Sequence, residues 1–314
     1  MEAAKTPVLD QLAGSGLFGL VDPIIPGEVP NTHSGTGMLM GLLPEQVDNL
    51  SRGPVEAAGA GRVLATGDIA MRSNFATVEN QDGMLMVTDR RAGRISTGAD
   101  ELAAMFSGFD LGDGIRASLV PTDQHRGALI LSGRGLSAAI SNTDPGDGDI
   151  PAAVRVCRPL SPEAGFTASK VNRFIGEAAR RLADHPVNIA RKHDGKLPAN
   201  GIITRGAGKQ FELDNMLHGL GVRAAVVSGC NTVLGVGRTF GFKAINDPRF
   251  TATVDTDLGA KVAAVCAALQ SHDMVFIHIK APDICSHDRN PRGKRDFLQR
   301  LDTALEPLLA TGAI

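Results

Sequence analysis

The stretch "DLGAKVAAVCAALQSHDMVFIHIKAP" (residues 257–282) carries the pattern that decides the fold. Residues 257–273 predict a helix, and residues 274–282 predict a buried strand whose polar end follows a short apolar run. A helix joined directly to a strand that is buried on both faces is typical of a parallel sheet covered by helices. We therefore expect an α/β fold.

The same alternation continues on both sides of this stretch. We expect further helices over residues 168–186 and 293–310 and further strands over 200–206 and 222–229, all belonging to one parallel sheet. Near the start of the chain the sequence predicts a helix over 4–14 with Thr6 as its N-cap, a strand over 17–26 and a helix over 35–43. Residues 1–59 and 151–314 together are predicted to form a doubly wound core.

The intervening residues 60–150 have a different texture. Short apolar or alternating runs at 67–79, 82–95 and 125–136 are separated by Asp-Gly and Gly-Arg breaks, and a single helix is expected over 99–106. This pattern indicates antiparallel strands. The sequence therefore predicts a smaller α+β domain inserted into the α/β core.

Composition excludes several classes of partner. A chain of 314 residues can form two domains, and its formal net charge of −2 gives no bulk attraction to nucleic acid or anionic membranes. No run of about 18 uncharged apolar residues indicates a membrane span. Trp and Tyr are absent, which disfavours stacking on single-stranded nucleic acid. The four scattered cysteines favour reduced thiols in a cytoplasmic protein.

The segment "NTHSGTG" (residues 31–37) offers three hydroxyl groups between a predicted strand and a predicted helix. The N-terminus of a helix favours anions, because its free N–H groups and its dipole point there. The hydroxyls of Thr32, Ser34 and Thr36 are therefore candidate reactive groups.

Asp283 and His287 directly follow the strand predicted at 274–282. Ligands of open α/β sheets gather at the carboxyl ends of strands, and a spacing of four residues puts both side chains on one helix face. A carboxylate and an imidazole suit Zn²⁺ or Mn²⁺. The alternative is a helix-capping aspartate beside a surface histidine.

A second group of candidates is basic. Guanidinium forks bind phosphate and carboxylate oxygens in pairs, so the segment "DRRAGR" (residues 89–94) could hold a phosphorylated acid. The alternative is the solvated end of a strand. The arginines concerned are Arg72, Arg90, Arg91, Arg94, Arg126 and Arg205.

Taken in order, ten segments of the chain closely resemble one family, the archaeal-type 2,3-bisphosphoglycerate-independent phosphoglycerate mutases of the alkaline phosphatase superfamily. The resemblance runs from about residue 4 to residue 309 and implies an alkaline-phosphatase-like core with an inserted substrate-binding domain. The segments are "AKTPVLDQLAGSGLFGLVDPIIPGEVPN", "RGPVEAAGAG", "GDIAMRSNFATV", "DRRAGRI", "HRGALILSGRGLS", "SNTDP", "DHPVN", "ANGIITRGAG", "VDTDLGAK" and "HIKAPDICSHD".

The resemblance also implies roles for individual residues. The nucleophile that takes up the phosphoryl group falls on Thr32, with Ser34 as the fallback, and Asp283 and His287 fall on a metal-binding pair for Mn²⁺ or Zn²⁺. The implied substrate is a small phosphorylated or phosphonylated carboxylic acid. The implied substrate-binding residues are Arg72, Asn74, Arg90, Arg91, Arg94 and Arg205.

The chain departs from the family pattern at several positions. His33 and Thr36 replace an aspartate and a histidine, Leu234 replaces a lysine, and Ser286 replaces a glycine. The family's first strand with its Asp-Gly motif, and its final Asp-His pair and histidine, lie outside these 314 residues. We therefore expect a fragment of a longer enzyme, or alternatively a shortened homologue that binds without catalysis.

Two activities remain open at this point. The overall likeness favours interconversion of 2-phosphoglycerate and 3-phosphoglycerate through a phosphoenzyme. Thr32 and Leu234 favour a diverged relative that moves a phosphoryl or phosphonyl group in phosphonate antibiotic biosynthesis, where some relatives are labelled phosphonopyruvate decarboxylase.

Overall fold

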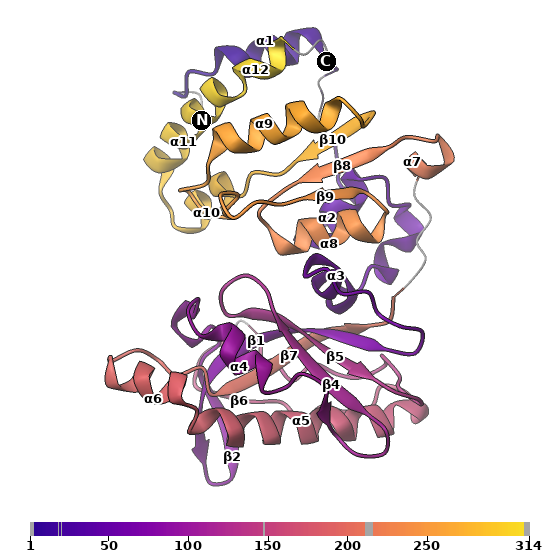
Figure 1. The fold of residues 1–314 in the computed structure, drawn as a ribbon, viewed down its shortest axis with the longest axis vertical. Helices are drawn as coiled ribbons and strands as arrows, with labels where there is room; N and C mark the ends of the chain where they lie inside the picture. Colours follow the sequence, from indigo (N-terminus) through magenta and orange to yellow (C-terminus); the bar gives the residue numbers. More distant parts are fainter. Residues whose placement is uncertain (1–2, 18, 20, 147, 211–215, 311–314) are drawn as a thin grey trace. The chain divides into compact units, whose positions relative to one another are not determined.

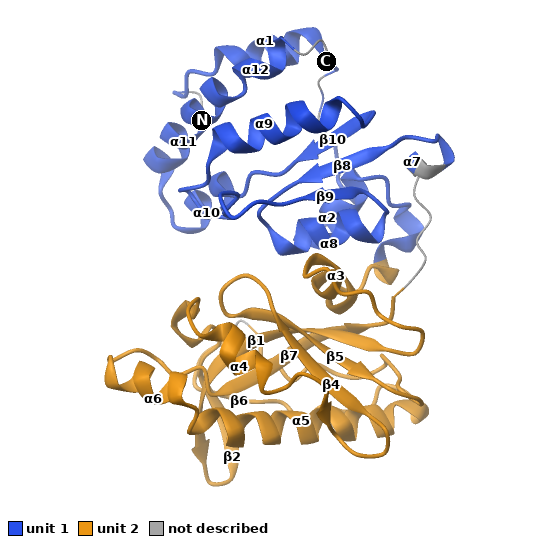
Figure 2. Ribbon diagram, in the orientation of Figure 1, with its two compact units in different colours: residues 1–47, 213–314 blue, residues 48–212 orange. Residues whose placement is uncertain are grey.

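The computed structural model describes residues 3–17, 19, 21–146, 148–210 and 216–310. The chain divides into two compact units, coloured separately in Figure 2. Unit 1 consists of residues 1–47 and 213–314, and unit 2 consists of residues 48–212. Each unit is described by itself below.

Unit 2 is larger than the insertion predicted at 60–150. It takes in α3 (Arg52–Gly59), α5 (Gly165–Ala183) and β7 (Gly201–Gly208), because α3 and β7 lie against β1 (Ile69–Gln81) and α5 lies against β7. The strand expected over 200–206 exists as β7, but its assignment to the parallel sheet is wrong, since β7 pairs antiparallel with β1. A short apolar run has the same pattern in either sheet, so only its pairing partner distinguishes the two.

The sheet of unit 2 is antiparallel and is organised around β1. The first half of β1 pairs with β5 on one side and β7 on the other, and its second half pairs with β2. The strand order is β3 (Phe109–Asp110), β4 (Arg116–Pro121), β5 (Arg126–Ser132), β1, β2 (Met84–Asp89) and β6 (Ala152–Ala153), with β7 off this path.

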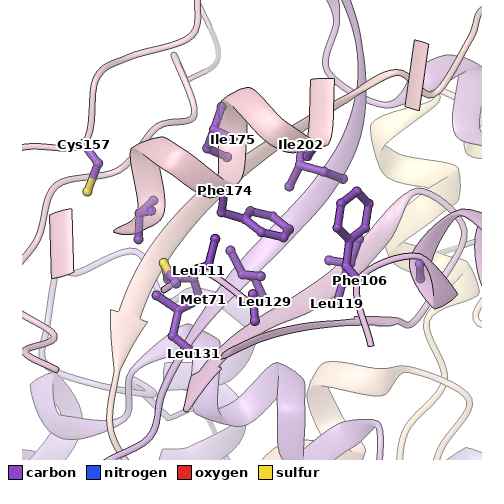
Figure 3. Packing of buried hydrophobic residues seen from close by; sticks show 14 of the residues in the cluster. Met71, Phe106, Leu111, Leu119, Leu129, Leu131, Cys157, Phe174, Ile175 and Ile202 are labelled. Carbon is purple, nitrogen blue, oxygen red and sulfur yellow. The ribbon is translucent and has the colours of Figure 1, made fainter. Parts of the chain in front are cut away.

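The two faces of this sheet differ in chemistry. Alternate residues of β1 such as Met71 and Phe75 enter a large apolar core, in which the rings of Phe106 and Phe174 meet edge to face with centroids 5.2 Å apart (Figure 3). The intervening residues of β1 lie on the opposite face, where Ala70 packs with Ala57 of α3. The other helical elements of unit 2 are η2 (Ala92–Arg94), α4 (Ala99–Ala104), η3 (Pro162–Ala164) and α6 (Pro186–His193).

Unit 1 contains a three-stranded parallel sheet. Its order is β10 (Met274–Ile277), β8 (Ala224–Val227) and β9 (Lys243–Ile245). In Figure 1, α9 (Leu258–Leu269) and α8 (Asn231–Thr239) lie on opposite sides of these strands. The helix α2 (Thr32–Leu39) lies beside α8, and α10 (Ala281–His287) follows β10. The chain is therefore a mixed α/β protein, as the sequence predicts.

Helices from both ends of the chain pack together in unit 1. The helix α1 (Pro7–Ser15) joins α11 (Pro291–Ala304) and α12 (Glu306–Leu309) around a shared apolar cluster. Thr6 precedes α1 as predicted but makes no capping hydrogen bond with its side chain. The carboxylate of Asp302 on α11 instead accepts hydrogen bonds from the backbone N–H groups of Val8 and Leu9 at 3.3 and 2.8 Å. Unit 1 also contains α7 (Met216–Gly219), and η1 (Pro44–Asn49) crosses the boundary between the units.

The strand predicted over 17–26 is wrong for the residues described there. The segment forms bends and a turn, and its apolar residues Leu17, Val21 and Ile25 are exposed. Pro23 and Pro26 lack the N–H groups that a ladder needs. The turn itself closes with a hydrogen bond from Glu28 N–H to the Ile25 carbonyl, and Gly27 adopts the positive φ (86°) that the turn requires.

No helix within the described ranges has both the length and the apolar character needed to cross a membrane.

Candidate active site

Strand register gathers four polar side chains on the face of unit 2 that α3 covers. Arg72 and Asn74 are two residues apart on β1 and so point to the same side. Arg205 of β7 pairs directly with Arg72, and Arg126 of β5 pairs directly with Asn74. Residues that pair across an antiparallel ladder share a face. Three strands therefore contribute arginines to one location.

Two further arginines join them. Arg52 lies at the start of α3, and the charges of Arg205 and Arg126 both lower its pKa. Arg90 follows the end of β2, and its backbone carbonyl accepts a hydrogen bond from Asn74 Nδ2 at 3.3 Å. We call the five residues Arg52, Arg72, Arg90, Arg126 and Arg205 the arginine cluster.

Asp144 and Glu56 are carboxylates that act on the arginine cluster. Asp144 is paired with Arg90 by two hydrogen bonds of 2.9 and 2.8 Å, and its Oδ2 lies 3.6 Å from Arg205 NH1. Burial opposes ionisation of Asp144, but hydrogen bonds from Arg90 and the Gly146 N–H outweigh it and lower its pKa. Glu56 of α3 is fully buried and interacts electrostatically with Arg52 and Arg72.

Burial and mutual repulsion both act on the cluster. Burial lowers the pKa of Arg72 to about 9, and the charges of Arg52, Arg126 and Arg205 add to the effect against the attraction of Glu56. The pKa of Arg52 is lowered for the same reasons, burial first. Like charges held together out of water are costly unless an anion compensates them.

The unpaired hydrogen-bond donors of the cluster also indicate that an anion would stabilise it. Within the part of the chain that the structure describes, the Nε atoms of Arg52, Arg72, Arg126 and Arg205 are buried without a hydrogen-bond partner. Beside the cluster, Asn74 Oδ1 and His125 Nδ1 also lack a partner among the described residues, but the amide oxygen is an acceptor and does not itself favour an anion. Since buried donors are normally satisfied, the cluster has the character of a site for an oxyanion.

Arg91 and Arg94 stand apart from the cluster. Both are exposed on the turn after β2, where Arg91 N–H bonds to Asp89 Oδ1 at 2.7 Å. The charge of Arg91 reaches the buried ring of His125, whereas Arg94 enters none of the ion pairs that the structure describes. Of the substrate-binding residues predicted, Arg72, Asn74, Arg90 and Arg205 are brought together.

In unit 1 the two candidate nucleophiles, Thr32 and Ser34, differ in their surroundings. Ser34 is buried, its Oγ accepts from Asn31 N–H at 3.0 Å, and it lies 3.3 Å from the Asn31 carbonyl as a donor. Its hydroxyl is therefore used to cap α2. Thr32 is half-buried in the first turn of the same helix.

The predicted metal pair lies on α10. His287 Nε2 is 3.7 Å from Asp283 Oδ1, and Lys280 Nζ is 2.5 Å from Asp283 Oδ2. The four-residue spacing does bring the two donors to one face. Two donors fit part of a zinc or manganese site, but the described residues contain no group of three or more His, Cys, Asp or Glu that could hold an ion.

Sequence reasoning missed Arg52, Glu56, His125 and Asp144. Each lies within a segment that carries the family resemblance, but none forms a recognisable motif by itself. The sequence predicts no helix over residues 52–59; had it done so, the spacing of four residues between Arg52 and Glu56 would have put a guanidinium and a carboxylate on one face.

Comparisons with known proteins identify the family of the chain. A family profile described as 2,3-bisphosphoglycerate-independent phosphoglycerate mutase matches residues 13–188. A mutase of that name from Methanopyrus kandleri is 39% identical over 99% of this chain and 74% of its own length. One from Methanoculleus marisnigri is 40% identical over 98% of this chain and 74% of its own length.

Solved structures show the same kinship. The cofactor-independent phosphoglycerate mutase of Thermoplasma acidophilum is 33% identical with a TM-score of 0.64, covering 99% of this chain and 77% of that one. A Pyrococcus horikoshii protein is 27% identical with a TM-score of 0.74, covering 99% of this chain and 72% of its own. The chain thus belongs to the family of 2,3-bisphosphoglycerate-independent phosphoglycerate mutases.

Proposed function

We propose that the arginine cluster binds a phosphoglycerate and that Thr32 accepts its phosphoryl group, so that 2-phosphoglycerate and 3-phosphoglycerate interconvert. The observation that carries this proposal is the set of buried guanidinium Nε atoms without partners on the α3 face of unit 2. They occur in a chain about 40% identical to proteins named phosphoglycerate mutase over almost its whole length.

Charge supports this class of substrate. Among the seven groups named, five guanidiniums against the carboxylates of Glu56 and Asp144 leave an excess of three positive charges. A phosphate monoester carries up to two negative charges near neutral pH and a carboxylate carries one. A small acid with one phosphate and one carboxylate therefore matches the cluster in charge.

Thr32 suits the acceptor role by its place on α2. In the proposed step Thr32 Oγ1 bonds to phosphorus as the bond from phosphorus to the substrate oxygen breaks, and the proton that leaves Thr32 Oγ1 is balanced by the proton that the departing substrate oxygen takes up, which gives glycerate. In the second transfer the other hydroxyl of glycerate bonds to phosphorus and gives up its proton, while the bond from phosphorus to Thr32 Oγ1 breaks and Oγ1 is protonated again. The N–H groups and dipole at the start of α2 stabilise negative charge on the transferred group.

Asp283 and His287 are the residues that would hold a Mn²⁺ or Zn²⁺ ion. When bound, such an ion supplies neutralisation of phosphoryl charge and lowers the pKa of a coordinated hydroxyl. The described residues supply two donors, so the ion needs others in addition.

The test uses the whole chain with Mn²⁺ and 3-phosphoglycerate, following 2-phosphoglycerate by NMR and the protein by intact mass. We expect turnover and a phosphoryl adduct that maps to Thr32. Thr32→Ala is expected to abolish both, and Ser34→Ala is expected to retain the adduct while weakening the cap of α2. An adduct on Ser34 in the wild-type protein would show that the assignment of the nucleophile is wrong.

A further inference from the structure

Glu56 places a negative charge inside a site built to attract anions. Its side chain is 1% exposed on α3, and Oε1 accepts a hydrogen bond from Thr122 Oγ1 at 2.7 Å. Its attraction acts on both Arg52 and Arg72. A buried carboxylate of this kind opposes the binding of every anion that the arginine cluster could take.

Glu56 and Asp144 differ in the elements that carry them and in their hydrogen-bond partners. Asp144 lies at the ends of Arg90 and Arg205 and forms two direct hydrogen bonds with Arg90. Glu56 instead comes from the helix that covers the sheet, and Thr122, at the end of β4, holds one of its oxygens in place. One of its oxygens is therefore held by a hydrogen bond from a residue outside the arginine cluster.

We propose that Glu56 determines specificity by limiting the excess positive charge of the arginine cluster. With Glu56 present the excess is three, which matches an acid with one phosphate and one carboxylate. Without Glu56 the excess is four. An added positive charge strengthens the binding of an acid with two phosphates more than that of an acid with one, because the former carries more negative charge. Glu56 thus favours monophosphorylated acids over bisphosphorylated ones. This inference rests on the proposed function, in which the cluster binds a phosphorylated acid.

A purely structural role for Glu56 predicts something different. Loss of its hydrogen bond to Thr122 would loosen α3 and weaken the binding of all anions by similar factors. A charge-limiting role changes the ratio of affinities for two acids that differ in charge. The ratio is therefore the quantity to measure.

The experiment is calorimetric titration of the full chain with 3-phosphoglycerate and with 2,3-bisphosphoglycerate at one ionic strength. We expect Glu56→Gln to shift the ratio of the two dissociation constants toward the bisphosphorylated acid by on the order of tenfold. The matched control is Glu177→Gln, which removes one carboxylate from the surface of α5 beside Arg180. We expect it to change the ratio by less than about twofold, because solvent screens exposed charges.

A second pair of variants covers the case in which Glu56→Gln does not fold. Arg52→Gln removes one guanidinium, and adding Glu56→Gln to it restores the wild-type excess of charge. The same shift of about tenfold is expected between the single and the double variant. An unchanged ratio in a folded Glu56→Gln protein, or between these two variants, overturns the inference.

The outcome for Glu56 can be told apart from the outcome for the proposed function. Wild-type protein that binds 3-phosphoglycerate but shows neither turnover nor an adduct contradicts the proposed reaction and leaves the affinity ratio measurable. Wild-type protein that binds neither acid overturns both the function and the inference.

Discussion

His125 shows how one residue can couple the arginine cluster to stability. It precedes Arg126 at the start of β5, and its ring is 6% exposed. Burial lowers the pKa of His125 to about 3, and the charges of Arg126, Arg91 and Arg72 add to this effect. The ring is therefore neutral in the folded protein under all mild conditions.

Acid should consequently destabilise the fold through this residue. In the unfolded chain His125 has a pKa of 6.5 and takes up a proton below that pH. In the folded chain the same ring is protonated only near pH 3. Stability from the neutral ring is thus present above pH 6.5 and is lost as the pH falls. Between pH 7 and pH 5 we expect His125→Asn to reduce the loss of unfolding free energy by about 1–2 kcal/mol relative to wild type, measured by urea denaturation.

The control for this prediction is His193→Asn, at an exposed position at the end of α6. It is expected to leave the wild-type pH dependence in place. Equal slopes for wild type and His125→Asn would show that His125 takes up its proton equally in both states.

At the level of single residues, the sequence predicts which chemical groups a site contains better than it predicts which residues contact one another. The types of Arg72, Arg90 and Arg205 already indicate an anion site. The contribution of Arg52 depends on α3 lying over β1, and that of Asp144 depends on a loop that reaches Arg90. Neither contact is local in sequence, so neither could be read from spacing.

Among the elements, α3 depends on close approach to β1. Gly53 lies in its first turn, and a Cβ atom there would come within 2.0 Å of the Ala70 carbonyl oxygen. Only glycine allows this helix to lie so near the strand. The position of Arg52 and Glu56 over the sheet depends on this close approach together with the contacts of α3 to β5 and β7.

Gly53→Ala should therefore displace α3. We expect a loss of about 2 kcal/mol or more in unfolding free energy and at least a tenfold weaker binding of 3-phosphoglycerate, measured by urea denaturation and calorimetry. The control is Gly176→Ala in α5, where a Cβ atom meets nothing within 4 Å. That change is expected to be neutral or to stabilise by up to about 1 kcal/mol. Equal behaviour of the two variants would contradict the role given to Gly53.

Sequence patterns predict most elements but not all of their partners. The helices at 99–106, 168–186 and 257–273 correspond to α4, α5 and α9, because amphipathic or apolar periodicity is local. The strand at 200–206 exists, yet its antiparallel pairing with β1 is a long-range choice. The strand expected at 17–26 shows the converse, since an apolar run without a ladder remains a turn.

For the whole molecule, the division into units explains why composition misplaces the boundaries. The change of texture at residues 60 and 150 marks where antiparallel patterning begins and ends. Unit 2 runs instead from 48 to 212, because elements from both of its ends cover or pair with β1. A boundary is set by contacts, and these contacts join residues more than 100 positions apart, such as Arg72 and Arg205.

Residues 48–212 are consequently expected to fold as an isolated fragment. We expect a single cooperative thermal transition by circular dichroism and binding of 3-phosphoglycerate within about tenfold of the full chain. The matched control is the fragment 60–150, which lacks α3, α5 and β7 and is expected to show no cooperative transition. A non-cooperative 48–212 fragment would contradict the independence of unit 2.

The alternation of β1 has a consequence for how this protein can change over time. Its two sets of side chains, Arg72 and Asn74 on one face and Met71 and Phe75 on the other, are interleaved along a single strand. Inserting or deleting one residue within this stretch would send the guanidinium into the apolar core and the phenyl ring to the face of the arginine cluster at once. A change of length between Met71 and Phe75 therefore disturbs both faces together, whereas point substitutions can change the set on the arginine-cluster face while the core set stays as it is.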